Sequence, residues 1–117
     1  MNNKKTVIIT GANKGIGFSI AKKFAKNNFN LILCTRVNFK NECIKFEEEY
    51  KINCKNYIFD FENFENVIEN AKKISIENEQ IDILINNAGY ISTGLFQMTK
   101  HEEFRKIFEI NFFSQIF

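Results

Sequence analysis

The chain of 117 residues contains no proline, no tryptophan, one histidine and three cysteines. Cys34, Cys43 and Cys54 are odd in number and lie nine and eleven residues apart, without the close spacing of a metal site or a redox motif. We therefore expect no metal centre and no disulfide framework. We expect reduced structural thiols, as in a cytoplasmic protein. Nothing in the sequence pairs the single histidine, His101, with a nucleophile.

A strong net charge and a long hydrophobic run are also absent. The 16 basic and 14 acidic residues leave a net charge of +2 that is spread along the sequence. This balance is too small to indicate a nucleic-acid or membrane partner. The apolar run Val7–Ile9, behind Lys4 and Lys5, is too short for a signal peptide or a membrane span. The sequence thus predicts a protein that stays in the cytoplasm.

The sequence does contain an alternation of strand-length apolar runs with segments of helical period. Strands are predicted at 6–10, 31–35, 57–59 and 81–85, and helices from about 16, over 39–50, over 64–74 and from 99 onward. The order β-α-β-α-β-α-β-α predicts the α/β class, as a Rossmann-like doubly wound parallel sheet with helices on both faces. The first helix is expected to turn one apolar face inward, formed by Ile16, Ile20, Ala21, Phe24 and Ala25.

Three of the five glycines lie in one turn between the first strand and the first helix, which reads Thr10-Gly11-Ala12-Asn13-Lys14-Gly15-Ile16-Gly17. Gly11 permits a tight turn, Gly15 lets backbone amides approach a pyrophosphate, and Gly17 lets the helix pack close to the strand. The helix N-terminus adds a partial positive charge. A tight turn without a ligand is the alternative. The dinucleotide interpretation predicts a binding site that includes Gly11, Asn13, Lys14, Gly15, Ile16 and Gly17.

The spacing Gly-x-x-x-Gly-x-Gly resembles the short-chain dehydrogenase/reductase family, whose members carry Thr-Gly-x-x-x-Gly-x-Gly. Three further features follow in the family's order: Asp60, the stretch Asn86-Asn87-Ala88-Gly89, and Asn111. The resemblance implies that Asp60 contacts the adenine and that Asn87, Ala88 and Gly89 lie beside the nicotinamide ribose. It also implies that Asn111 holds a water in a proton relay. The residue pattern itself leaves a hydrogen-bonded core asparagine as the alternative for Asn111.

The end of the second predicted strand indicates which nicotinamide cofactor is preferred. A NAD-binding fold places a carboxylate about 20 residues after the glycines, where it accepts from the ribose hydroxyls. This chain instead has Arg36, 19 residues after Gly17, where a guanidinium suits a 2′-phosphate. Lys14 is a second candidate cation for the same phosphate, although either side chain alone could be a solvated surface charge. Together they favour NADP(H) over NAD(H).

The residues that the family uses for catalysis are missing from the sequence. The resemblance requires a serine, and a tyrosine followed four residues later by a lysine, yet no tyrosine of the chain has a lysine at that distance. We therefore expect residues 1–117 to be an NAD(P)-binding Rossmann domain that lacks the catalytic half and is inactive on its own. The resemblance also implies a possible homo-oligomer through the helix that contains Asn111.

Three functions remain open on the sequence. The first is a fragment of an NADP(H)-dependent oxidoreductase, which transfers hydride between the nicotinamide and a small-molecule carbonyl or alcohol. The second is a non-catalytic NADP(H)-binding module, which a natural stop at residue 117 with tight cofactor binding would favour. The third is an inactive remnant, which a failure to fold or accumulate would favour.

Overall fold

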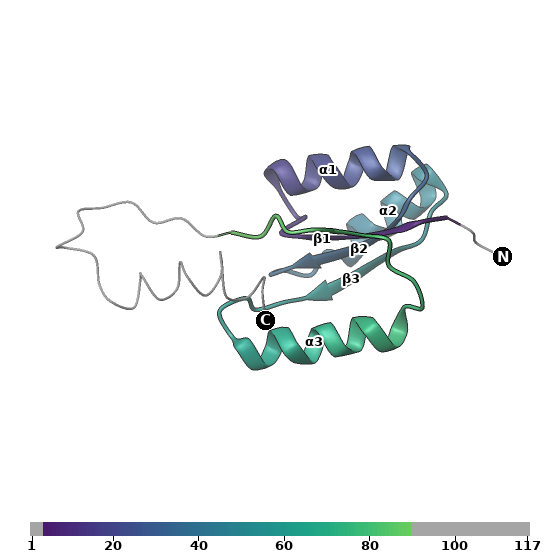
Figure 1. Ribbon diagram of the computed structural model, residues 1–117. Coiled ribbons are helices and arrows are strands. Elements are labelled where there is room, and N and C mark those ends of the chain that lie inside the picture. The colour runs from purple at the N-terminus through teal and green to yellow at the C-terminus, as the bar shows by residue number, and fades with distance from the viewer. Residues whose placement is uncertain (1–3, 90–117) are drawn as a thin grey trace.

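The computed structural model describes residues 4–89, which form a four-stranded parallel sheet with helices on both faces (Figure 1). The elements are, in chain order, β1 (Thr6–Thr10), α1 (Gly15–Lys26), β2 (Asn30–Thr35), α2 (Lys40–Tyr50), β3 (Cys54–Ile58), α3 (Phe64–Glu77) and β4 (Ile83–Ile85). The alternating order and the doubly wound α/β architecture predicted from the sequence are confirmed over these residues. The predicted fourth helix, with Thr99 and Asn111, lies outside the described residues.

The strands lie in the order β3-β2-β1-β4, and every pair is parallel. Val7 of β1 pairs with Leu31 on one side and Ile83 on the other, so β1 is a central strand. Helices cover both faces of β2, and Leu31 through Thr35 are accordingly all buried. The chain builds outward from β1 to β3 and then crosses back to add β4 on the other side of β1. This reversal creates a crevice at the carboxyl ends of β1 and β4, which is where such sheets bind ligands.

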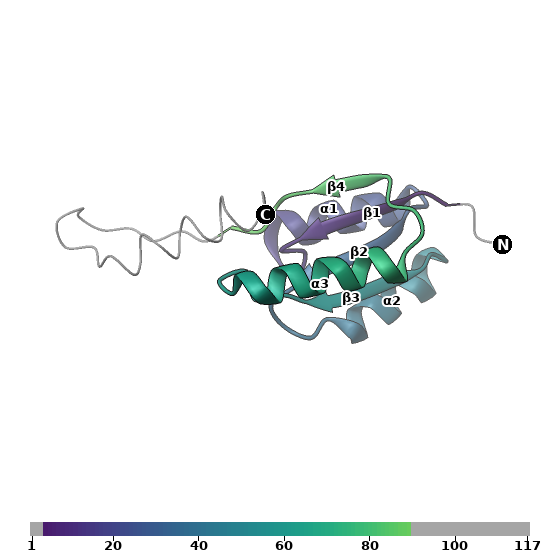
Figure 2. The ribbon, with the colours of Figure 1, turned by 60° about the horizontal axis from the view of Figure 1, so that its bottom comes forward.

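Helices α1 and α2 cover one face of the sheet and α3 covers the other, as Figures 1 and 2 show. Gly17, Ala21 and Ala25 are the buried residues of α1, because small side chains let the helix lie close to the strands. The prediction is wrong for one residue of the inward apolar face of α1. Ile16 is 74% exposed, since it sits in the first turn at the carboxyl edge of the sheet, where it lines a cavity described below.

The starts of β3 and β4 differ by two or more residues from the sequence prediction, and β4 begins at Ile83 rather than at residue 81. β3 begins at Cys54 rather than at residue 57, because Lys55 and Asn56 interrupt the apolar run that would have marked it. Polar side chains are tolerated there because β3 is an edge strand of the sheet. Left-handed residues follow both helices on this face, since Asn28 after α1 has φ 68° and Lys51 at the end of α2 has φ 56°.

The three cysteines are free and buried, as predicted. Burial raises the pKa of the Cys34 thiol to about 12. The pKa of Cys54 is raised above its usual range, chiefly by a hydrogen bond with Cys43 and secondly by burial. Within residues 4–89, no group of three potential metal ligands is brought together and no helix has the length and apolarity to cross a membrane.

Candidate functional site

The glycine turn between β1 and α1 has a backbone that only glycine adopts easily. Gly11 has φ 65° and Gly15 has φ 59°, both in the left-handed region. A Cβ on Gly11 would also lie 2.9 Å from Cα of Ala88, and a Cβ on Gly17 would lie 2.3 Å from the carbonyl oxygen of Gly11. The space around Gly15 is open, so its backbone is accessible to a ligand. Gly11 thus has the positive φ of a tight turn, Gly15 has open space around it, and Gly17 packs closely against the Gly11 carbonyl.

A hydroxyl group ties this turn to the end of β4. Oγ1 of Thr10 accepts the backbone N–H groups of Asn87 and Ala88, each at 2.9 Å, and donates to the carbonyl of Ile85 at 3.4 Å. The Asn87 amide Nδ2 in turn donates to the carbonyl of Gly11 at 3.1 Å. These bonds hold the segment after β4 against the glycine turn, although the two segments are more than 70 residues apart in sequence.

The N-terminus of α1 opens toward this turn without a compensating negative group. Its N-cap residue, Lys14, makes no side-chain capping bond, and the first turn of the helix contains no acidic residue. The first amides of a helix have no intrahelical partner and carry the positive end of the helix dipole. An anion is therefore the natural partner for this helix end.

A cavity of about 680 Å³ lies where these elements meet. It brings together nine of the residues predicted for the cofactor site, namely Gly11, Asn13, Lys14, Gly15, Ile16, Arg36, Asn87, Ala88 and Gly89. They come from the glycine turn, the end of β2 and the segment after β4. Two predicted residues do not line it: Gly17 packs behind Gly11, and Asp60 lies in the turn after β3. Asn111 lies outside the described residues.

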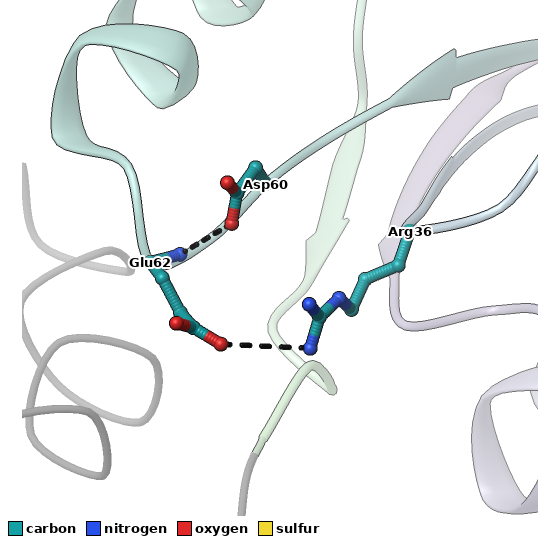
Figure 3. A network of polar contacts seen from close by, with 3 residues as sticks. All are labelled: Arg36, Asp60 and Glu62. Carbon is teal, nitrogen blue, oxygen red and sulfur yellow. Dashed lines mark hydrogen bonds and ion pairs between the residues drawn. The ribbon is translucent and has the colours of Figure 1, made fainter. Parts of the chain in front are cut away.

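Arg36, which lines the cavity, contacts a carboxylate of the turn after β3 (Figure 3). Nη1 of Arg36, just after β2, lies 3.7 Å from Oε1 of Glu62, in the turn after β3. The Asp60 carboxylate accepts the backbone N–H of Glu62 at 3.1 Å. Asp60 therefore braces its own turn, while Glu62 reaches across to the arginine.

Asn56 of β3 holds the segment that carries Arg36. Its Nδ2 donates to the carbonyl of Leu33 at 3.0 Å and to Oγ1 of Thr35 at 2.9 Å, and its Oδ1 accepts the backbone N–H of Phe39 at 2.8 Å. The bonded groups lie on both sides of Arg36 in the sequence. One side chain thus fixes both ends of the loop between β2 and α2.

Sequence reasoning missed four contributors to this region: Val37 and Phe61, which line the cavity, and Asn56 and Glu62, which position or contact its residues. Phe61 is buried and stacks on Phe59 with ring centroids 5.2 Å apart, so its apolar character indicates core as readily as site. Asn56 had one signal, since an asparagine inside a strand needs a partner for its amide. Glu62 had none, because its role depends on a residue 26 positions away.

A family model described as short chain dehydrogenase matches residues 5–117. The chain belongs to the short-chain dehydrogenase family. A 3-oxoacyl-acyl-carrier-protein reductase of Buchnera aphidicola is 34% identical to this chain over 109 residues, which are 92% of this chain and 43% of the relative.

Solved structures of the family share the fold. An alcohol dehydrogenase from Thermococcus sibiricus in complex with 5-hydroxy-NADP has a TM-score of 0.89 at 26% identity, over 96% of this chain and 48% of that one. A short-chain dehydrogenase from Sphingobium yanoikuyae in complex with NADPH has a TM-score of 0.88 at 26% identity, over 96% of this chain and 44% of that one. The chain thus spans less than half the length of these relatives.

Proposed function

We propose that residues 1–117 are the cofactor-binding half of an NADP(H)-dependent oxidoreductase. In the whole protein, hydride would pass from the nicotinamide to the carbonyl carbon of a small-molecule substrate, or to the nicotinamide from the hydroxyl-bearing carbon of an alcohol. The observation that carries the proposal is Arg36, which follows β2 directly and lines the cavity beside the glycine turn. At that position a NAD-preferring fold has a carboxylate, which would repel the 2′-phosphate of NADP(H). The guanidinium of Arg36 would not repel it.

The residues of the cavity fit the parts of a dinucleotide in order. The open backbone at Gly15 and the amides that begin α1 suit the pyrophosphate. Arg36 and the exposed Lys14 suit a 2′-phosphate on the adenosine ribose. Asn87, Ala88 and Gly89, at the end of β4, would face the nicotinamide ribose.

Two more predicted residues belong to this proposal. Asp60 would contact the adenine from the turn after β3, where its carboxylate already accepts the N–H of Glu62. Asn111 would join a proton relay to a lysine of the catalytic half. Both assignments follow from the family to which the chain belongs.

Exchange of Arg36 for aspartate tests the cofactor preference. Arg36→Asp replaces attraction of the 2′-phosphate by repulsion, so NADPH binding is expected to weaken by about 100-fold and NADH binding by far less. Titration of both cofactors into wild type and variant, with Lys22→Asp on the exposed face of α1 as the control, gives the two ratios. Equal loss of NADPH and NADH affinity in Arg36→Asp would sink the NADP assignment.

The sequence leaves a second candidate open, a chain that binds NADP(H) without turnover. The two candidates differ in the mass of the protein in its native cell. A mass near twice 13.8 kDa, measured on protein captured through its N-terminal half, supports the oxidoreductase with its catalytic residues downstream. A mass of 13.8 kDa together with NADPH binding supports the binding module.

The remaining expectations are part of the same proposal. We propose a cytoplasmic location, a small-molecule substrate, and pairing of copies through the helix that would contain Asn111. Sedimentation of the whole protein with and without an Asn111-helix substitution, such as Phe112→Glu, measures the pairing. A monomer in both cases contradicts it.

A further inference from the structure

The turn between β3 and α3 places a carboxylate opposite the arginine that we assign to the 2′-phosphate. Glu62 is held there by its backbone, because its N–H donates to Oδ1 of Asp60 at 3.1 Å. The N–H of Asp60 donates to Oδ1 of Asn66, in the first turn of α3, at 2.8 Å. The neighbouring Phe61 is buried against the sheet. The direction in which the Glu62 side chain leaves the turn is therefore set by the fold.

The contact that results is an ion pair between Glu62 and Arg36, which lines the cavity (Figure 3). The side chain of Arg36 is 59% exposed and that of Glu62 35% exposed, and one guanidinium nitrogen lies 3.7 Å from one carboxylate oxygen. A single contact at this distance and exposure is weak, because water screens both charges. An incoming anion with two negative charges can displace such a partner.

We propose that Glu62 competes with the 2′-phosphate of NADP(H) for Arg36 and so sets how strongly the chain prefers NADP(H) over NAD(H). This inference rests on the proposed function. A 2′-phosphate bound by Arg36 must either displace the carboxylate from the guanidinium or lie beside it, and both cost binding free energy. NAD(H) has a hydroxyl at that position and meets neither cost. Glu62 therefore lowers the NADP(H) preference that Arg36 creates.

Neutralising the carboxylate tests this assignment. Glu62→Gln keeps the length of the side chain and removes its charge, and should tighten NADPH binding by about threefold while NADH binding stays unchanged. The matched control is Glu65→Gln, which removes an exposed carboxylate three residues further along the chain, in the first turn of α3, and is expected to change neither affinity. The measurements are titrations of the full chain, monitored by the fluorescence of the reduced nicotinamide.

Half-cofactors isolate the adenosine end of the site. Titration with 2′,5′-ADP and with 5′-AMP asks whether the gain depends on the 2′-phosphate, and we expect Glu62→Gln to tighten only the former. In the Arg36→Gln background the Glu62→Gln gain should shrink, since the two side chains act on each other. A gain of the same size with and without Arg36 would overturn competition for the guanidinium.

The outcomes separate this inference from the function on which it rests. If Arg36→Gln weakens NADPH and NADH equally, the NADP preference is wrong, and the role of Glu62 falls with it. If Arg36→Gln weakens NADPH selectively but Glu62→Gln leaves NADPH unchanged or weakens it, the preference stands and the competition is overturned. Selective loss in the first variant with selective gain in the second supports both.

Discussion

Thr10 and Asn87 are joined by a hydrogen bond of 2.9 Å from the backbone N–H of Asn87 to the threonine hydroxyl, across 77 positions of sequence. The same hydroxyl accepts the N–H of Ala88, and Thr10 is 9% exposed. Two amides at the end of β4 thus depend on one side chain at the end of β1. The geometry of the crevice between these strands follows from this contact.

Removal of the Thr10 hydroxyl should loosen that crevice. Thr10→Val keeps the shape of the side chain but leaves the N–H groups of Asn87 and Ala88 without their acceptor, which should lower the free energy of unfolding by about 1–3 kcal/mol. Urea unfolding measures the loss, and cofactor titration should show weaker binding. Thr10→Ser, which retains the hydroxyl, should recover most of both. Equal behaviour of the valine and serine variants would contradict this role of the hydroxyl.

Asn56 should matter for stability and for the NADPH preference together. Asn56→Ala removes the acceptor of the Phe39 N–H and the two hydrogen bonds that the amide donates to Leu33 and Thr35, so we expect unfolding to become easier by about 1–3 kcal/mol. Because the bonded groups flank Arg36, NADPH should lose more affinity than NADH.

Asn53→Ala is the control for Asn56, since Asn53 is exposed and the change should alter the unfolding free energy by less than about 0.5 kcal/mol. For both variants, urea unfolding measures the stability, and titration with each cofactor measures the ratio of NADPH to NADH affinity. An Asn56→Ala variant that is destabilised with an unchanged ratio would show that the asparagine supports the sheet without positioning Arg36.

The buried thiol of Cys34 should make stability depend on alkaline pH. Burial raises the pKa of Cys34 to about 12 in the folded chain, whereas an unfolded cysteine has a pKa of about 8.5. The folded state thus binds the proton more tightly, and its contribution to stability is present below the unfolded pKa. It is lost as pH rises from the unfolded pKa through the folded one.

Thermal unfolding followed from pH 7 upward measures this slope. Cys34→Ala should reduce it, although the variant begins from a lower stability because a cavity is left in the core. The other buried cysteines keep part of the slope, since Cys54 also has a raised pKa. An unchanged slope in Cys34→Ala would contradict the assignment to this thiol.

Much of the fold could be predicted because it is encoded locally. The sequence predicts the bounds of the β-branched strand β1 correctly, and it places the glycine turn where the structure has it. These features depend on residues within a few positions of one another, through backbone preference and periodicity. The predicted start of β3 is wrong because Lys55 and Asn56 interrupt the apolar residues of this edge strand, so that hydrophobicity alone does not reveal its first residues.

The candidate site divides in the same way. The sequence determined which residues could bind a dinucleotide, because glycine at fixed spacing and a cation in place of an acid have direct chemical meanings. Only the tertiary structure decided that Thr10 holds Asn87, that Asn56 flanks Arg36 with hydrogen bonds, and that Glu62 faces Arg36. Each of these contacts joins strands that are adjacent in the sheet but distant in the chain. A sequence pattern records neighbours along the chain, whereas the order β3-β2-β1-β4 determines which side chains meet.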